Sequence, residues 1–248
     1  MGQAILRTEQ VTKSFGANLA VAGVSLEVQE GTLHTIIGPN GAGKTTLFNL
    51  LTKDLPPTSG RIVFAGEDVT HRQPYEVSRL GVGRSYQITS IFAGMTVHDN
   101  VWVAAYRNAR GGFFDFWSRA ARFGDLRLRT EDVLAHAGLG GRGARLAREL
   151  SYGDQRLLEI AIALATEPRL LLLDEPTSGL SQEETQKVAE LIRRLARQYT
   201  VVMIEHKVDV VMTISDRISV MNFGEIIAEG TPAEIMANER VKKAYFGT

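Results

Sequence analysis

Cysteine is absent from the 248 residues of this chain, and so are long apolar runs and any excess of charge of one sign. Without cysteine the chain can form no disulfide, no thiol nucleophile and no cysteine-ligated metal site, which agrees with a reducing compartment. Lys and Arg total 28, as do Asp and Glu, so no long-range field attracts the protein to nucleic acid or anionic lipid. We therefore expect partners to be recognised by shape and by local patches.

Hydrophobic runs also stay well short of the ~20 residues that a membrane-spanning helix needs, and the first residues lack the apolar core of a signal peptide. If the protein works at a membrane, we expect it to act from the soluble side. Hydrophobic residues make up 44% of the chain, which is enough for the core of one large α/β domain or of two small lobes.

A glycine-rich segment that fits the pattern G-x-x-x-x-G-K-[ST] follows the apolar run Leu33–Ile37. Its residues are Gly38, Pro39, Asn40, Gly41, Ala42, Gly43, Lys44, Thr45 and Thr46. In such a loop, backbone N–H groups point at phosphate oxygens, Lys44 reaches the β- and γ-phosphates, and the Thr45 hydroxyl is offered to Mg²⁺. The alternative is a glycine-rich turn that only caps a helix. With a strand before it and an apolar helix after it, the segment predicts a site for a nucleoside triphosphate.

Two carboxylates, Asp174 and Glu175, follow the apolar run 170–173, at the end of a strand where open α/β sheets bind ligands. We expect Asp174 to hold Mg²⁺, directly or through water, and Glu175 to polarise the attacking water. The plainer alternative is that both acids only end the strand. The next apolar run, 200–204, ends in Glu205 and His206. A lone histidine there is more often only a surface residue.

The residue pattern changes twice along the chain. Residues 5–31 and 62–64 contain short β-rich pieces between glycines and predict antiparallel strands. Residues 88–150 have helical spacing, clustered arginines and no convincing strand, which predicts a helical insert. Beyond it we expect, in order, a helix at 155–165, strands at 170–173 and 200–204 around a helix at 182–198, a hairpin at 218–228 and a last helix from 231.

Residues 150–155, which read Leu-Ser-Tyr-Gly-Asp-Gln, precede a helix that Ser151 can cap. In this context they resemble the signature sequence of the ATP-binding cassette (ABC) family. The matching positions, in chain order, are Phe15, the phosphate loop, Gln87, the signature, Asp174 with Glu175, residues 178–181, and His206. The resemblance covers nearly the entire chain and implies a single ABC ATPase domain.

The implied fold is α/β, with a phosphate-loop NTPase core whose mainly parallel sheet is flanked by helices. Residues 1–87 and 151–248 would form this core together with an antiparallel β subdomain, and residues 88–150 the inserted helical subdomain.

The resemblance also implies roles for single residues. Family members pair head to tail, so Ser151 and Gly153 would face the γ-phosphate bound by a second ATPase subunit. Phe15 would stack on adenine, although a phenylalanine of the core or of a strand is the alternative. Gln87 would bring its amide to Mg²⁺ and the water, and His206 would donate to the γ-phosphate.

Three positions depart from the commonest family pattern: Tyr152 and Asp154 in the signature, and Ser181 where aspartate is usual. The form Ser-Tyr-Gly-Asp-Gln is similar to that of the branch serving branched-chain amino acid and urea importers. The length of the insert and the ending 241–247 are also similar to that branch. Ser181 can still hydrogen-bond across a dimer, and with Glu184 it forms a capping box.

Aromatics interleave with arginines in residues 107–129, so a nucleic-acid site is one interpretation and a helix with a solvated charged face is the other. The net charge of zero argues against the nucleic-acid site. The resemblance implies that residues 88–95 and the insert receive a helix of an integral membrane permease. It places the protein at the cytoplasmic face of the inner membrane, with an extracytoplasmic solute-binding protein in the same system and no direct contact with nucleic acid. The alternatives are another transport system, such as lipopolysaccharide export, or a nucleic-acid-associated ABC ATPase.

Overall fold

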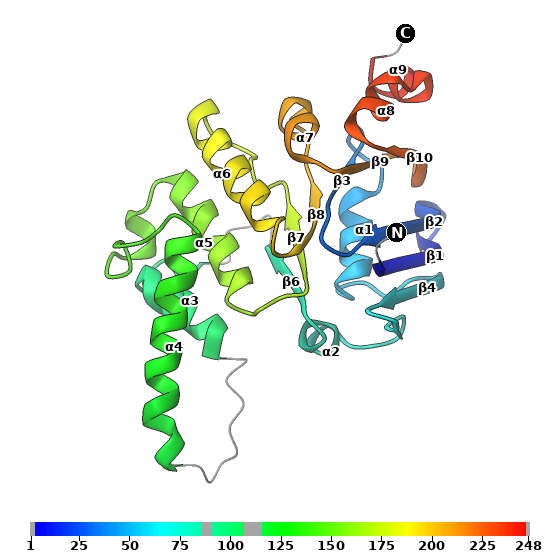
Figure 1. Ribbon diagram of the computed structural model, residues 1–248. Coiled ribbons are helices and arrows are strands. Elements are labelled where there is room, and N and C mark those ends of the chain that lie inside the picture. The colour runs from blue at the N-terminus through cyan, green and yellow to red at the C-terminus, as the bar shows by residue number, and fades with distance from the viewer. Residues whose placement is uncertain (1–2, 86–90, 107–115, 247–248) are drawn as a thin grey trace.

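The computed structural model describes residues 3–85, 91–106 and 116–246, with the backbone alone for 116–123 and 245–246 (Figure 1). Gln87 and residues 88–90 of the expected docking segment lie outside the described residues. Residues 107–115, which carry much of the aromatic and arginine cluster, lie outside them as well.

A six-stranded sheet in the order β10-β9-β3-β8-β7-β6 forms the centre of the molecule. Its strands are β3 (Leu33–Ile37), β6 (Val82–Ser85), β7 (Leu170–Asp174), β8 (Thr200–Ile204), β9 (Arg217–Asn222) and β10 (Glu225–Gly230). All neighbours pair in parallel except β9 and β10, which form an antiparallel hairpin. The expected mainly parallel sheet is confirmed. Sequence patterns missed β6, because Val-Gly-Arg-Ser has neither an apolar run nor alternation and is a strand through its pairing with β7.

A second, antiparallel sheet has the order β2-β1-β4-β5, as expected for the first part of the chain. Its strands are β1 (Ala4–Phe15), β2 (Asn18–Gln29), β4 (Ser59–Phe64) and β5 (Glu67–Asp68). It packs with helix α1 (Lys44–Leu51) against one face of the central sheet, where one hydrophobic core combines residues of β1, β2, α1 and β7.

Residues 170–173 of β7 are all apolar because both faces of this strand are covered. Leu170 and Leu172 point into the core shared with α1, whereas Leu171 and Leu173 point into a second core. Helices α5 (Tyr152–Leu164) and α6 (Gln182–Leu195) cover that second face. Helix α5 begins before the expected residue 155, because Ser151 caps it, and α6 ends three residues before residue 198.

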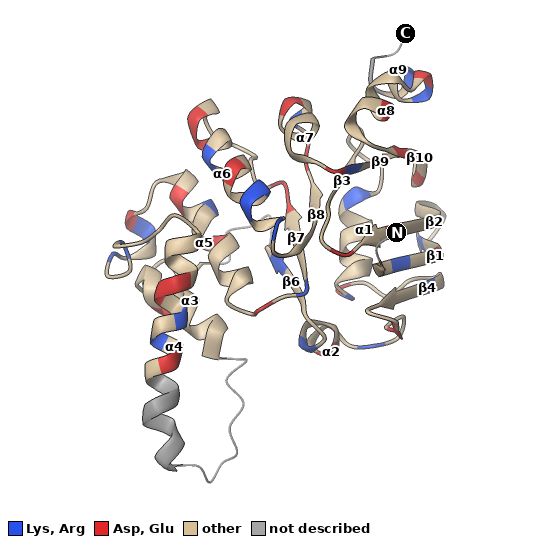
Figure 2. Cartoon of the chain, viewed as in Figure 1, with Lys and Arg blue, Asp and Glu red and all other residues tan. Residues whose placement is uncertain are grey.

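The insert is helical, as expected. It contains α3 (Val97–Tyr106), α4 (Phe116–His136) and the 3₁₀ turn η1 (Ala147–Glu149), and α3 and α4 pack beside α5 (Figure 1). Within residues 91–106 and 116–150, β pairing is limited to a single bridge between Thr96 and Leu146. In the view of Figure 2, acidic and basic residues intersperse along α4 and α6 rather than forming a patch of one sign.

The remaining helices are short: α2 (Pro74–Arg79), α7 (Val208–Ile214), α8 (Pro232–Ala237) and α9 (Glu239–Phe246). Helix α8 is the helix expected from residue 231; Thr231 caps it in a capping box with Glu234, and α9 follows it as an additional helix. Of the helices in the described part of the chain, none combines the length and the apolar character needed to cross a membrane.

Candidate functional site

The glycine-rich loop joins the end of β3 to the start of α1, and two of its glycines are required by close backbone contacts. A Cβ on Gly38 would lie 2.2 Å from the carbonyl oxygen of Met221, and one on Gly43 would lie 2.2 Å from that of Ala20. Gly43 also has φ +96°, a left-handed conformation that L-residues rarely adopt. The loop is therefore wedged between β9 and β2, and α1 begins immediately after it at Lys44.

Lys44 is a buried cation inside this loop. Its ammonium donates to the carbonyl oxygens of Gly38 at 2.8 Å and Pro39 at 2.9 Å. Burial lowers the pKa of Lys44, while the nearby carboxylates of Glu175 and Asp174 oppose that shift. A phosphate brought to the loop would give this ammonium a charged partner in place of neutral carbonyls.

A cavity of about 460 Å³ opens over the loop. It is lined by Phe15, Asn18, Leu19, Ala20, residues 40–46, Glu175, His206 and Phe223. The structure thus brings together Phe15, most of the phosphate loop, Glu175 and His206, which lie far apart in the sequence. Phe15 lies at the rim, half-exposed, with the Lys13 ammonium 5.2 Å from its ring centroid.

Phe223 is a lining residue that the sequence analysis missed. Phe223 is 86% exposed, and its backbone has φ +45°, which is uncommon for a residue with a bulky side chain. The turn that carries it is fixed by backbone bonds from Gly224 N–H to Ala42 at 3.0 Å and from Ala22 N–H to Gly224 at 2.9 Å. The available signal was a Phe-Gly pair at the tip of the expected hairpin, where Asn or Asp is the usual residue before Gly.

Glu175 and His206 meet at the edge of the cavity. His206 Nε2 lies 2.7 Å from Glu175 Oε1, which joins the ends of the neighbouring strands β7 and β8. Glu175 has φ +48° and its backbone N–H donates to Ile204. Glu205, fully buried, accepts from the backbone N–H groups of His206 and Lys207 and so holds the turn that presents the histidine.

Asp174 lies deeper, at the end of β7. Its Oδ2 accepts from Arg84 Nη2 at 3.0 Å, and its buried Oδ1 has no hydrogen-bond partner among the described residues. Burial raises the pKa of this carboxyl, and the Arg84 guanidinium opposes the shift. No group of three or more His, Asp or Glu side chains in the described part of the chain gathers to ligate a metal. A free carboxylate oxygen beside a phosphate site nevertheless fits Mg²⁺, which takes one or two carboxylates and completes its shell with phosphate and water.

The signature residues lie at the start of α5. The Ser151 hydroxyl accepts from the backbone N–H of Asp154 at 3.1 Å, which confirms the expected cap. The N–H of Gly153 donates to Glu184 Oε1 at 3.2 Å, and a Cβ on Gly153 would lie 2.7 Å from that oxygen. Neither Ser151 nor Gly153 is among the described residues that line the cavity of Lys44. The Glu184 carboxylate, through its bond to Gly153, occupies the N-terminus of α5, where anions are favoured.

The unusual signature residue Tyr152 packs on segment 178–181. A Cβ on Gly179 would lie 3.1 Å from the tyrosine ring, and Gly179 has φ +75°. The tyrosine hydroxyl accepts from Arg156 at 2.8 Å, and Arg156 forms a buried ion pair with Glu159. Tyr152 thus lies against segment 178–181 at Gly179, where a larger residue would meet its ring.

A family model described as "ABC transporter" matches residues 21–178, well over half of the chain. The chain belongs to the ABC transporter family. As a member of this family it is an ATP-hydrolysing enzyme. A second model, described as "Branched-chain amino acid ATP-binding cassette transporter", matches residues 225–248.

Relatives and solved structures of this ABC family match over the full length. The high-affinity branched-chain amino acid transport ATP-binding protein LivG of Salmonella typhimurium is 40% identical over 100% of this chain and 99% of its own. An ATP-binding cassette of an ABC transporter in its ADP conformation has a TM-score of 0.86 at 30% identity, covering 99% and 100%. A dimeric cassette bound to ADP and Pi has a TM-score of 0.78 at 26% identity, covering 92% and 98%.

Proposed function

We propose that this ABC ATPase drives the uptake of branched-chain or related amino acids, or of urea and amides, through a separate permease. The observation that carries the catalytic part is the cavity in which Lys44, Glu175 and His206 meet. The choice of solute is supported by the full-length similarity to LivG and by the second family model.

In this proposal, the loop amides and Lys44 bind the β- and γ-phosphates of ATP, and the Thr45 hydroxyl and Asp174 Oδ1 hold Mg²⁺. The bound ion offsets charge on the phosphate oxygens. Glu175 accepts a proton from the attacking water. His206, whose Nε2 lies 2.7 Å from Glu175 Oε1, would exchange this contact for a hydrogen bond to the γ-phosphate. Gln87 is expected to join them, from outside the described residues.

Aromatic side chains would hold the base. Phe15 lies at one side of the cavity, and Phe223 is presented by a turn bonded to the phosphate loop. Stacking on an aromatic ring contributes roughly 1–3 kcal/mol per base. The strained, exposed conformation of Phe223 is typical of residues at ligand sites.

A second copy of the chain, or a similar cassette, would complete each site. Ser151 and Gly153 lie outside the cavity lining of their own chain, on a helix N-terminus suited to an anion. The dimeric relative with ADP and Pi supports this arrangement. In the closed pair, the γ-phosphate of the partner would replace Glu184 at the N–H of Gly153.

The permease would dock near Phe92. This side chain is 56% exposed, while Ile91 beside it packs against the core. Buried Asn100 fixes the segment: its Oδ1 accepts from Phe92 N–H at 2.7 Å, and its Nδ2 donates to the carbonyls of Phe92 and Thr96. An apolar side chain on a fixed backbone suits a protein contact at the cytoplasmic face of the membrane. A solute-binding protein would deliver the substrate on the opposite side.

The test is a genomic Glu175→Gln replacement in the source cell, followed by uptake of radiolabelled leucine, isoleucine, valine and urea. We expect uptake of at least one of these solutes to fall to background. Glu183→Gln serves as the matched control, because Glu183 is exposed on α6 and its carboxylate pairs with Lys187 at 2.6 Å. Unchanged uptake of all four solutes would contradict the assignment of solute.

A further inference from the structure

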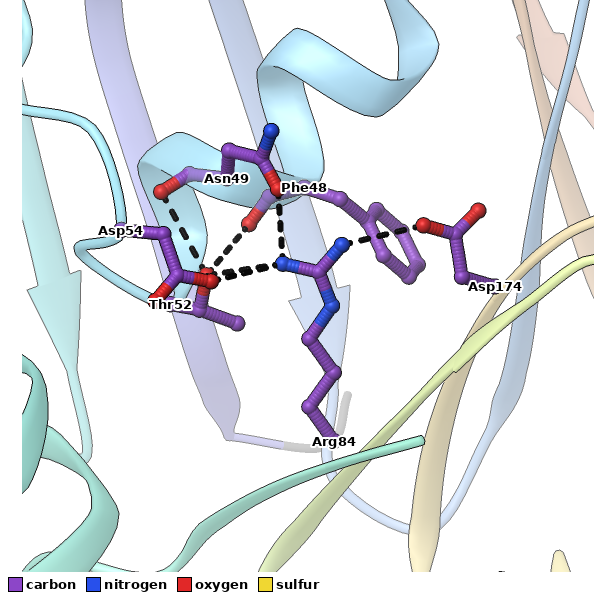
Figure 3. Close-up of polar contacts among 6 residues, drawn as sticks. All are labelled: Phe48, Asn49, Thr52, Asp54, Arg84 and Asp174. Carbon is purple, nitrogen blue, oxygen red and sulfur yellow. Dashed lines mark hydrogen bonds and ion pairs between the residues drawn. The ribbon is translucent and has the colours of Figure 1, made fainter. Parts of the chain in front are cut away.

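Arg84 is a buried arginine at the end of β6, and its side chain is 7% exposed. Figure 3 shows its guanidinium between the end of α1 and the carboxylate of Asp174. Nη1 donates to Asn49 Oδ1 at 2.7 Å, to Asp54 Oδ2 at 2.9 Å and to Thr52 Oγ1 at 3.2 Å. Nη2 donates to Asp174 Oδ2 at 3.0 Å.

The two terminal nitrogens of the Arg84 guanidinium bind different parts of the molecule. Nη1 is fixed by three oxygens at the end of α1, the helix that begins at Lys44, and the guanidinium carbon lies 5.9 Å from the ring centroid of Phe48 on the same helix. Nη2 is thereby set at a defined place beside β7. Among the described residues, Asp174 is hydrogen-bonded through Oδ2 alone, so Oδ1 is the oxygen left for a ligand.

Buried ion pairs are often no better for stability than apolar residues of the same size, so stability alone gives little reason for this arrangement. A planar guanidinium can hold several oxygens in fixed directions, which the single ammonium of lysine cannot. The arrangement suits the orientation of a carboxylate better than it suits core packing.

We propose that Arg84 is the positioning residue of the ion site: it holds Asp174 Oδ2 and thereby directs Oδ1 to the metal. The inference rests on the proposed role of Asp174 as an Mg²⁺ ligand. Arg84 itself is not among the described residues that line the cavity over the phosphate loop. Partners that orient a ligand typically change metal affinity by about 10- to 100-fold when they are replaced.

The test measures Mn²⁺ affinity by electron paramagnetic resonance, with the full chain and ADP, so that no hydrolysis is involved. Arg84→Lys keeps the charge and loses the planar guanidinium, and Arg84→Met loses both. We expect the Mn²⁺ dissociation constant to rise about tenfold in Arg84→Lys and at least as much in Arg84→Met. The affinity for ADP measured with EDTA should stay within about twofold, because the loop and Lys44 are unchanged.

Two further variants separate the possible failures. Arg156→Lys alters an arginine of equal burial that is paired with Glu159, and it should leave Mn²⁺ affinity unchanged. Asp174→Asn should weaken Mn²⁺ binding at least as much as Arg84→Lys does. If Asp174→Asn has no effect, the proposed role of Asp174 is wrong. If Asp174→Asn weakens binding but neither Arg84 variant does, or if Arg156→Lys weakens it equally, the inference about Arg84 is overturned.

Discussion

At the scale of single residues, the group that we propose to bind phosphate and the group that we propose to polarise water are different side chains of one cavity. Lys44 lies inside the phosphate loop and bonds its carbonyls, whereas Glu175 lines the same cavity and bonds His206. The two groups should therefore fail differently when they are replaced.

Glu175→Gln is expected to reduce ATP turnover by about 10²–10⁴, the usual effect of losing a general base, while nucleotide affinity remains near that of the wild type. Lys44→Ala is the contrasting variant. It should weaken ATP binding by roughly 1.5–3 kcal/mol, because a charge-assisted bond to phosphate is lost. Steady-state turnover and calorimetric titration distinguish the two. Normal turnover in Glu175→Gln would exclude this carboxylate as the base.

At the scale of elements, the parallel strands place the chemistry at their carboxyl ends and buried polar groups in their bodies. His34 of β3 is fully buried, and its Nε2 lies 2.8 Å from the Ser219 hydroxyl of β9. Burial lowers the pKa of His34 to about 4, and the positive charge of Arg217 adds to the shift.

This shift predicts a pH-dependent stability. The pKa of His34 is 6.5 in the unfolded chain and about 4 in the folded one, so between these values the unfolded state binds more protons. The contribution of His34 to the free energy of unfolding is therefore fully present above pH 6.5. It is lost as the pH drops toward 4, and about 2 kcal/mol of it is gone at pH 5. In urea titrations, the free energy of unfolding of His34→Gln should fall by about 2 kcal/mol less between pH 7.5 and pH 5 than that of the wild type. Equal losses would contradict the buried neutral histidine.

Two of the capping boxes, those that begin with a hydroxyl residue at the start of α6 and α8, offer a matched pair. Ser181 begins α6 and Thr231 begins α8, each bonded to a glutamate three residues on, Glu184 or Glu234. Replacing either cap by alanine should cost about 1 kcal/mol of unfolding free energy. Only Ser181→Ala should also weaken ATP-driven association, because Glu184 contacts Gly153 of the signature as well. If both variants associate equally, segment 178–181 takes no part in the dimer contact.

The elements also show how far the sequence alone could predict the structure. The phosphate loop, β7 and β8 were predictable because glycine patterns and continuous apolar runs are local signals. The strand β6 was not, since its Arg84 is buried through partners on α1 and β7 that no local pattern reveals. Phe223 was missed for the same reason: its position at the cavity depends on contacts of its turn with β2 and the phosphate loop.

At the scale of the whole molecule, the insert should respond to a permease and the core to nucleotide. Phe92→Asp places a charge in the proposed contact, so transport is expected to fall strongly while the ATPase rate of the isolated chain changes less than about twofold. Met236→Asp on α8 is the control, since Met236 is similarly exposed. Full transport by Phe92→Asp in reconstituted vesicles would reject the docking site. An equal loss of basal ATPase would show that the segment is structural.

The central claim is that one chain holds only half of each nucleotide site. Sedimentation velocity of Glu175→Gln with and without Mg²⁺ and ATP tests it most directly, because this variant should retain ATP without hydrolysing it. We expect a monomer without nucleotide and a particle of twice the mass at saturating ATP. Gly153→Asp adds a carboxylate beside the N–H that is proposed to meet the partner's γ-phosphate, so we expect it to remove this association. A Glu175→Gln chain that stays monomeric at saturating ATP, or a Gly153→Asp variant that still dimerises, would contradict the claim.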